Sequence, residues 1–288
     1  MTVTTREKTT RRRGPFLWKE WSITAALLGA AVVFLIPAWG VLLTSLKTDA
    51  DISLNGVWAP SGNLTVDNYL SLIFDVRVAS YLRNSFLVTI PSTLISVSLG
   101  AVAGYALAKL HIRGSNVILL FIVSGLFIPP QILLIPLFQM FNQLGLYNTL
   151  WPMIIIHSAY GLSLCTLVMR NFFDKVPDEL LEAALVDGAP HPRILWSIAL
   201  PLSRPALAAL ATLQFTFIWN DFLYPLIFTR SEAAQTIMVG ILSLGGQYST
   251  AFGAQAALSV IASLPTLLVF FIFQKQFIQG LTVGAVKG

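Results

Sequence analysis

The chain contains a run of 56 residues, from Gly114 to Met169, without a single Asp, Glu, Lys or Arg. A helix that crosses the hydrocarbon core of a bilayer needs about 20 apolar residues, so this run is long enough for two crossings. Only 11% of the 288 residues are charged, whereas a soluble domain has roughly 25%. The net charge of +5 is also too dilute for a nucleic-acid-binding surface. The pattern excludes a soluble enzyme and predicts an all-α polytopic membrane protein.

Four other runs are uncharged or almost uncharged, and together with the longest run they predict six transmembrane helices. The longest run divides at a polar turn around Asn142, and Pro129, Pro130 and Pro136 should kink or break the helix before that turn. The first half of the last run has the glycine-rich segment 245–253, which we expect outside the bilayer. The six expected helices are Ser22 to Leu46, Asn84 to Ala108, Val117 to Phe141, Leu150 to Met169, Pro205 to Thr229 and Ala256 to Gln274.

The positive charges predict the orientation of these helices, because cytoplasmic loops retain Lys and Arg. If both termini are cytoplasmic, 14 of the 18 Lys and Arg residues lie inside and 4 lie outside. Residues 1–21 then form a basic cytoplasmic tail, residues 47–80 an extracytoplasmic loop, and residues 279–288 a second cytoplasmic tail. The first apolar run has 25 residues, longer than the apolar region of about 7–15 residues in a signal peptide. We therefore expect a retained helix at 22–46.

Small residues recur every fourth position in the second expected helix, at Ser92, Ser96, Gly100, Gly104 and Ala108. Such a stripe lets another helix approach closely, and Gly100 with Gly104 forms the GxxxG pattern. We interpret the stripe as packing within this subunit and not as a ligand site.

The fifth expected helix carries one ionisable residue, Asp221, next to Asn220. An ionisable residue within a span is costly, so Asn220 and Asp221 are candidates for lining a transport pathway. An equally acceptable interpretation places Asp221 at the outer interface, where it reaches water or a loop cation and Trp219 acts as an interfacial anchor.

Catalytic and cofactor chemistry is not indicated. His157 and Cys165 have no carboxylate or second ligand near them in the sequence, so we expect them to be packed core residues. No Ser, His and acid grouping can be assembled inside the bilayer. A phosphate-binding P-loop needs a Gly-Lys pair, and no lysine in this chain follows a glycine. The chain is therefore not expected to hydrolyse ATP by itself.

The loop 171–204 carries a short amphipathic helix that we expect at about Asp178 to Asp187. Pro177 suits its first turn, Asp178 and Glu179 complement the helix dipole, and Gly188 suits a left-handed cap after its end. Leucines on this helix would face the cytosol unless something covers them. A membrane surface would repel its four acids, so a protein partner is the better explanation.

The spacing of this loop resembles the EAA loop of binding-protein-dependent ABC importer permeases. The residues that carry the resemblance are Glu182, Ala183, Ala184, Asp187, Gly188, Ala189, Ile198, Leu200 and Pro201. Further segments look like the multiple-sugar branch of that family: Asn84 with Ser85, Pro129 to Pro136, Leu144 to Thr149, Trp219 to Phe222, and Gly280 to Gly288. The family commonly has Glu where Asp221 stands and Ala where Val283 stands.

The resemblance implies a type I ABC importer transmembrane fold over residues 81–278 and a multi-pass location in the cytoplasmic membrane. It implies a second permease subunit, two ATPase subunits and an extracytoplasmic sugar-binding protein as partners, with membrane lipid around them and no nucleic acid. The loop helix would dock on the ATPase, with Glu182 in polar contact and Gly188 at the exit turn, and the tail from Gln279 would touch the ATPase too.

The implied function is sugar or oligosaccharide import by alternating access. ATP and Mg would bind to the partner ATPase, and this chain would hold no metal or cofactor. Two alternatives remain open: an ABC importer permease for a non-sugar solute, and an ion-coupled secondary transporter, which needs intramembrane charges that are scarce in this chain.

Overall fold

The computed structural model describes residues 16–244 and 251–285, and within these residues it contains helices and no β-strand. Three segments lie outside the described residues: most of the expected basic tail (1–15), most of the glycine-rich segment (245–250) and the end of the second expected tail (286–288). The helices are α1 (Phe16–Ser45), α2 (Asp49–Asn55), α3 (Asp67–Ile73), α4 (Val76–Lys109), α5 (Ser115–Ser124), η1 (Gly125–Phe127), α6 (Pro130–Gln143), α7 (Trp151–Phe173), α8 (Asp178–Val186), α9 (His191–Ile194), η2 (Leu195–Ala199), α10 (Leu200–Leu202), α11 (Arg204–Trp219), α12 (Leu223–Phe228), η3 (Glu232–Ala234), α13 (Ile237–Ser243) and α14 (Phe252–Ala285).

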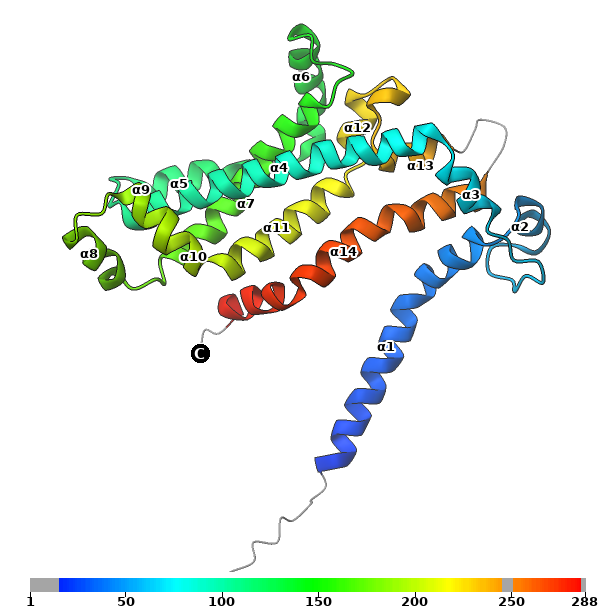
Figure 1. The fold of residues 1–288 in the computed structure, drawn as a ribbon, viewed down its shortest axis with the longest axis horizontal. Helices are drawn as coiled ribbons and strands as arrows, with labels where there is room; N and C mark the ends of the chain where they lie inside the picture. Colours follow the sequence, from blue (N-terminus) through cyan, green and yellow to red (C-terminus); the bar gives the residue numbers. More distant parts are fainter. Residues whose placement is uncertain (1–15, 245–250, 286–288) are drawn as a thin grey trace, which may run out of the picture.

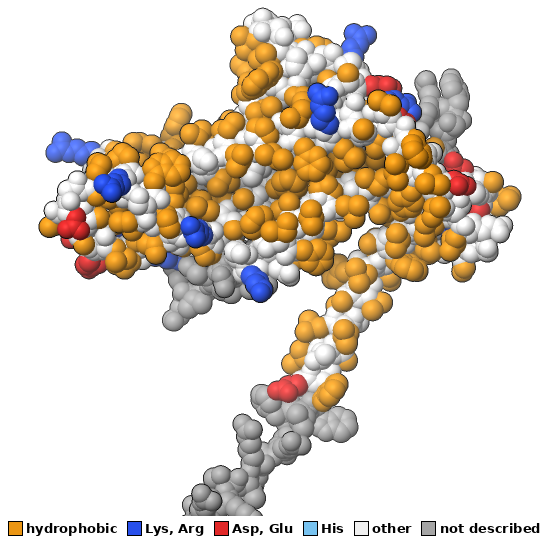
Figure 2. Space-filling view, viewed as in Figure 1, with side chains coloured by type: hydrophobic (Ala, Val, Ile, Leu, Met, Phe, Trp, Pro, Cys, Tyr) orange, Lys and Arg blue, Asp and Glu red, His pale blue; other side chains and the backbone are white. Residues whose placement is uncertain are grey.

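Among the residues that the structure describes, four helices are long and apolar enough to cross a membrane, and the number rises to six if two bent helix pairs each count as one span. The four are 20–45 in α1, α4, α7, and 252–276 in α14. They overlap the first, second, fourth and sixth helices expected from the sequence. Hydrophobic side chains cover the visible face of the bundle and of α1, while most charged side chains lie toward the ends (Figure 2).

The bundle has two ends with different contents (Figure 1). The α8 end holds α8, α9 and α10, and the opposite end, called the α2 end here, holds α2, α3 and α13. Helices α4, α7, α11 and α14 run between the two ends. Helix α1 leaves the α2 end and diverges from the other helices, so its apolar side chains have few contacts within this chain.

The first bent pair is the third expected helix, which breaks between η1 and α6 with an angle of 94°. Ile128 and Pro129 have extended backbone conformations, and Pro130 begins α6. The cause is local: proline has no backbone N–H to donate, and it disfavours a helical conformation in the residue before it. Pro136 lies inside α6 and does not end it.

The fifth expected helix, at 205–229, is wrong as a continuous helix. Helix α11 ends at Trp219, and after a short break α12 begins at Leu223. Helix α11 also pairs with the segment 191–202 across a bend of 78°, so helical structure extends into the expected polar loop. Asp221 explains the break, since its carboxylate accepts hydrogen bonds from the backbone N–H groups of Leu223 and Tyr224 at 3.1 and 3.3 Å. Short polar side chains compete for backbone groups in this way.

Helices α4 and α7 form the closest packed pair. A Cβ atom on Gly100 would lie 2.3 Å from the Cβ atom of Cys165, and one on Gly104 would lie 2.7 Å from the backbone nitrogen of Arg170. Neither distance can be accommodated without a shift of the helices. Gly100 and Gly104 therefore lie where α4 contacts the backbone of α7.

Candidate functional site

Helix α8 begins and ends as its sequence predicts. Pro177 precedes it, Asp178 and Glu179 occupy its first turn, and Asp187 follows its last residue. Gly188 then adopts a left-handed conformation with φ of 79°, which glycine reaches without steric cost. The backbone N–H groups of Asp187, Gly188 and Ala189 donate to carbonyls in the last turns of α8, at 3.1, 3.0 and 2.9 Å. The chain therefore reverses sharply at Gly188.

One side of α8 packs into the protein. Leu181 is buried, and it joins a core cluster with Tyr105 of α4, Phe173 of α7 and Ile194 of α9. Four residues of the predicted coupling set pack against this cluster as well: Ala184, Ala189, Ile198 and Leu200. These four residues are partly buried and hold the loop on the bundle.

The other side of α8 is exposed and partly apolar. Leu180 is 50% exposed and Val186 is 87% exposed, and apolar side chains that are exposed together on one surface mark a site that another protein can cover. The remaining predicted coupling residues are also exposed: Glu182, Ala183, Asp187, Gly188 and Pro201. We call Leu180, Glu182, Ala183, Val186, Asp187 and Gly188 the α8 outer face. Leu181 therefore does not face the cytosol as expected for the leucines of this helix, whereas Leu180 and Val186 are exposed.

The start of α8 is attached to the end of α4 by an ion pair. The Lys109 Nζ atom lies 2.5 Å from the Asp178 Oδ1 atom. The hydrogen bond from Lys109 lowers the pKa of the Asp178 carboxyl below its usual value. The ion pair therefore stabilises the fold at neutral pH, and that contribution is lost only as the pH falls through this lowered pKa.

The break between α11 and α12 gathers polar groups from two helices. The Asp221 Oδ2 atom lies 3.2 Å from the Nε2 atom of His157 on α7, and both side chains are mostly buried. No carboxylate lies near His157 in the sequence, but the fold brings Asp221 to it from 64 positions along the chain. The His157 ring also packs edge-on against Tyr224, with ring centroids 5.4 Å apart. Asn220, in contrast, is exposed at this break, and its amide donates to the Thr216 carbonyl oxygen at 2.8 Å.

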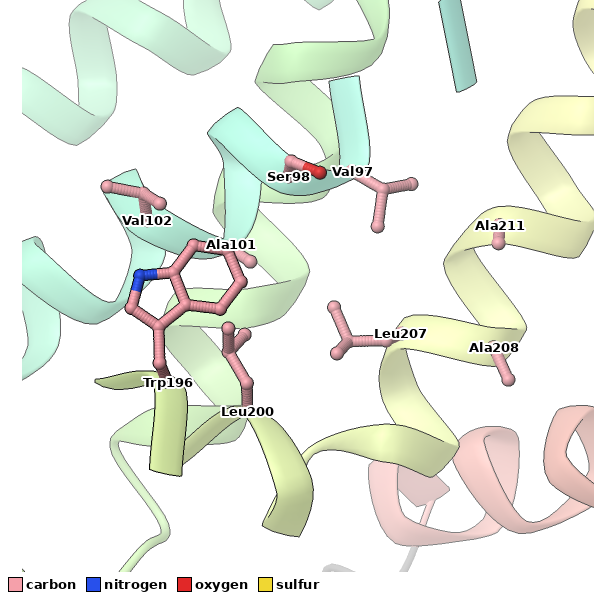
Figure 3. A pocket seen from close by; sticks show the side chains of 9 residues that line it. All are labelled: Val97, Ser98, Ala101, Val102, Trp196, Leu200, Leu207, Ala208 and Ala211. Atoms are coloured by element: carbon pink, nitrogen blue, oxygen red, sulfur yellow. The ribbon is translucent and has the colours of Figure 1, made fainter. Parts of the chain in front are cut away.

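A groove of about 320 Å³ lies between α4, η2, α10 and α11. Its lining side chains are apolar except for Ser98 and the indole nitrogen of Trp196, and Figure 3 shows Trp196 over Ala101 and Val102. A sugar site requires several hydrogen-bonding groups that converge on the ligand hydroxyls. The groove lacks them, and we do not assign it to a polar substrate. Within the described residues, no cluster of three or more His, Cys, Asp or Glu side chains could hold a metal ion.

The family of the chain follows from residues 96–283, which include α8 and the break at Asn220. These residues match the model of a family described as binding-protein-dependent transport system inner membrane component. The chain belongs to this family. It is thus a permease, a transport subunit of an ABC importer, and a multi-pass protein of the cytoplasmic membrane.

The relatives of this permease match it over most of its length. It is 33% identical to the arabinooligosaccharides transport system permease of Halalkalibacterium halodurans, over 96% of this chain and 99% of that one. It is 36% identical to the trehalose/maltose transport system permease of Thermococcus litoralis, over 78% and 82% of the two chains. Its fold is that of a bacterial ABC transporter structure involved in the import of the acidic polysaccharide alginate, with a TM-score of 0.79, 22% identity, and coverage of 93% of this chain and 100% of that one.

Sequence reasoning missed two features of the permease. In the sequence Lys109 is only one of the positive charges expected inside, and no local pattern shows that it reaches Asp178, 69 positions later. The sequence alone predicts an isolated core residue at His157, whereas the fold places the carboxylate of Asp221 beside it.

Proposed function

We propose that the permease imports a sugar or an oligosaccharide, driven by ATP hydrolysis in a separate ATPase subunit. The observation that carries the proposal is the α8 outer face: an exposed, partly apolar surface on a short helix whose sequence resembles the coupling loop of the family. Two relatives that cover most of the chain are named for oligosaccharide or disaccharide transport. These relatives support the sugar as cargo, and a non-sugar solute is the alternative cargo.

The proposed assembly has this permease as one half of a pore, beside a second permease subunit. Two ATPase subunits dock from the cytoplasm, and an extracytoplasmic sugar-binding protein delivers the cargo. In this arrangement both termini and the α8 end are cytoplasmic, the bent pair 115–143 forms one span, α11 with α12 forms another, and six spans result. The distribution of Lys and Arg, 14 inside against 4 outside, supports this orientation.

Coupling in this proposal is mechanical. ATP binding closes the ATPase dimer, and the docked α8 moves with it. Since Leu181 packs α8 against α4, α7 and α9, the movement passes into the spanning helices and changes which side of the membrane the pore opens to. ATP and Mg bind to the ATPase, and this chain supplies the docking surface and half of the pathway.

A cysteine at Val186 tests whether the α8 outer face is covered by the ATPase. The native Cys165 is buried, so the Val186→Cys variant has one accessible thiol among the described residues. We expect maleimide to label this variant in the isolated permease and to label it far more slowly in the assembled importer. Leu181→Cys, on the buried side of the same helix, is the matched control and should stay unlabelled in both states. Equal labelling of Val186→Cys in both states would contradict the docking surface.

We also propose that Asn220 lines the sugar pathway, and that Asp221 shapes the helix break that presents it. Asn220 is exposed in this subunit, while Asp221 is mostly buried and held by α12 and His157. Replacing Asn220 with Ala should raise the KM for the sugar about tenfold if its amide hydrogen-bonds a sugar hydroxyl. Asn171→Ala, an exposed amide at the α8 end of α7, is the control. An unchanged KM in Asn220→Ala would remove this residue from the pathway.

The cargo is tested by purifying the complex through a tag on this permease and adding the binding protein with candidate ligands. The proposal predicts that one or a few glycans stimulate ATP hydrolysis and that amino acids, peptides and phosphate do not. Stimulation by one of these other solutes, with no response to glycans, would establish the alternative cargo.

A further inference from the structure

We propose that Lys109 is a positioning residue that joins the first turn of α8 to the end of α4, so that movement of α8 is transmitted to the α4–α7 pair. The inference rests on the proposed function, because it assigns a role in coupling. It adds a residue outside the sequence pattern of the coupling loop.

Lys109 is held on two sides. Its Nζ atom donates to the backbone carbonyl oxygen of Val176 at 2.7 Å and lies 2.5 Å from the Asp178 Oδ1 atom. The Lys109 side chain is only 7% exposed. A lysine gives up its hydration only where other partners replace it, and here a carbonyl and a carboxylate do so. A lysine at the end of a span more often extends to the lipid headgroups, and the protein contacts of Lys109 argue against that role.

The position of the ion pair makes it a mechanical link. Val176 and Asp178 lie on either side of Pro177, where the chain enters α8. Lys109 is the last residue of α4, and α4 is locked against α7 at Gly100 and Gly104. Any displacement of the first turn of α8 must therefore either break these two contacts or move the end of α4.

The rest of α8 offers few other attachments. Leu181 is its only buried side chain, and a hollow of about 180 Å³ lies between this helix and the end of α4. The hollow is lined by Lys109, His111, Asp178, Glu182 and His191 together with Tyr105 and three leucines. Apolar packing between α8 and the end of α4 is therefore incomplete. The contacts of Lys109 connect these two helices where apolar packing alone does not.

The test compares Lys109→Met with Lys109→Arg in the complete importer reconstituted in liposomes, with sugar uptake and ATP hydrolysis measured together. Methionine keeps the length of the stem and removes both hydrogen bonds, while arginine restores a donor. We expect Lys109→Met to transport about tenfold less sugar per ATP, the effect of losing a charge-assisted hydrogen bond. Lys109→Arg should recover most of the ratio. Arg113→Met, which removes an exposed cation from the same loop, should leave the ratio unchanged.

An unchanged ratio in Lys109→Met, or an equal fall in Arg113→Met, would overturn the inference. If Lys109→Met fails to assemble, Asp178→Ala is the deciding variant, because Lys109 then keeps its hydrogen bond to Val176. A lowered ratio of sugar to ATP in Asp178→Ala supports the link, and an unchanged ratio overturns it. Hydrogen–deuterium exchange of residues 178–186 is an independent readout, and it should be faster in Lys109→Met than in wild type. Faster exchange in a complex whose wild type imports no glycan would contradict the proposed function and leave the link intact.

Discussion

In the reconstituted importer, Gly188→Asp is expected to abolish most sugar uptake while the permease still inserts and ATP is still hydrolysed. Gly188 has φ of 79° and no other atom within 4 Å of a Cβ added to it, so an aspartate fits the free subunit with modest backbone strain. On the α8 outer face it places an unpaired charge in the interface that we assign to the ATPase. Such a charge costs several kcal/mol, and about 1.4 kcal/mol already corresponds to a factor of ten. Uptake per ATP should therefore fall at least about tenfold.

Two controls separate the charge from the backbone strain. Gly188→Asn has almost the same shape and tolerates the left-handed conformation, so it should retain much more uptake than Gly188→Asp. Gly114→Asp places the same side chain at φ of 78° with equally open space, in the loop between α4 and α5, and should be nearly neutral. Full uptake in Gly188→Asp would refute the coupling role of α8. An equal loss of uptake in all three variants would show that backbone strain, and not the charge, causes the loss.

Gly100→Val is expected to prevent α4 and α7 from packing and to cause a large loss of folded permease. The new Cβ atom would lie 2.3 Å from that of Cys165. Inserting side-chain volume into a packed contact costs about 1–3 kcal/mol or more, because neighbouring atoms must shift. The chain has one cysteine, and Cys165 is fully buried under Gly100. Its labelling by maleimide therefore reports directly on separation of the two helices.

Cys165 should be unreactive in the wild-type permease in mild detergent and reactive in Gly100→Val, which should also elute as aggregate in size-exclusion chromatography. Gly29→Val is the matched control, because a Cβ on Gly29 of α1 meets nothing within 4 Å. A monodisperse Gly100→Val permease with an unreactive Cys165 would show that the two helices do not pack as described.

Much of the fold could be predicted because membrane-spanning helices carry their own signal. Uncharged stretches of the required length identified the helices within α1, α4, α7 and α14, and the proline pair at 129–130 located the break before α6. The break at Asn220 was missed for a physical reason. The length of an uncharged run shows where a helix can cross the membrane. The end of α11 depends instead on hydrogen bonds from backbone N–H groups to Asp221, which the length of an uncharged run does not reveal.

The candidate site, like the fold, was predictable only in part. The local sequence was sufficient to predict α8, since Pro177, the acids of its first turn and Gly188 define a short helix and the turn that follows it. Which of its apolar residues face a partner was not predictable, because Leu181 and Val186 differ only in what the fold places beside them. Lys109 with Asp178, and His157 with Asp221, are contacts between distant segments, and single-sequence patterns contain no information on such pairs.

ATP-driven import by this permease is tested most directly by uptake into sealed proteoliposomes that contain the purified complex, with the sugar-loaded binding protein outside and ATP inside. We expect sugar accumulation that requires ATP hydrolysis and the binding protein and is unaffected when proton and sodium gradients are collapsed. Uptake that proceeds without ATP and follows an ion gradient would contradict it and would identify a secondary transporter.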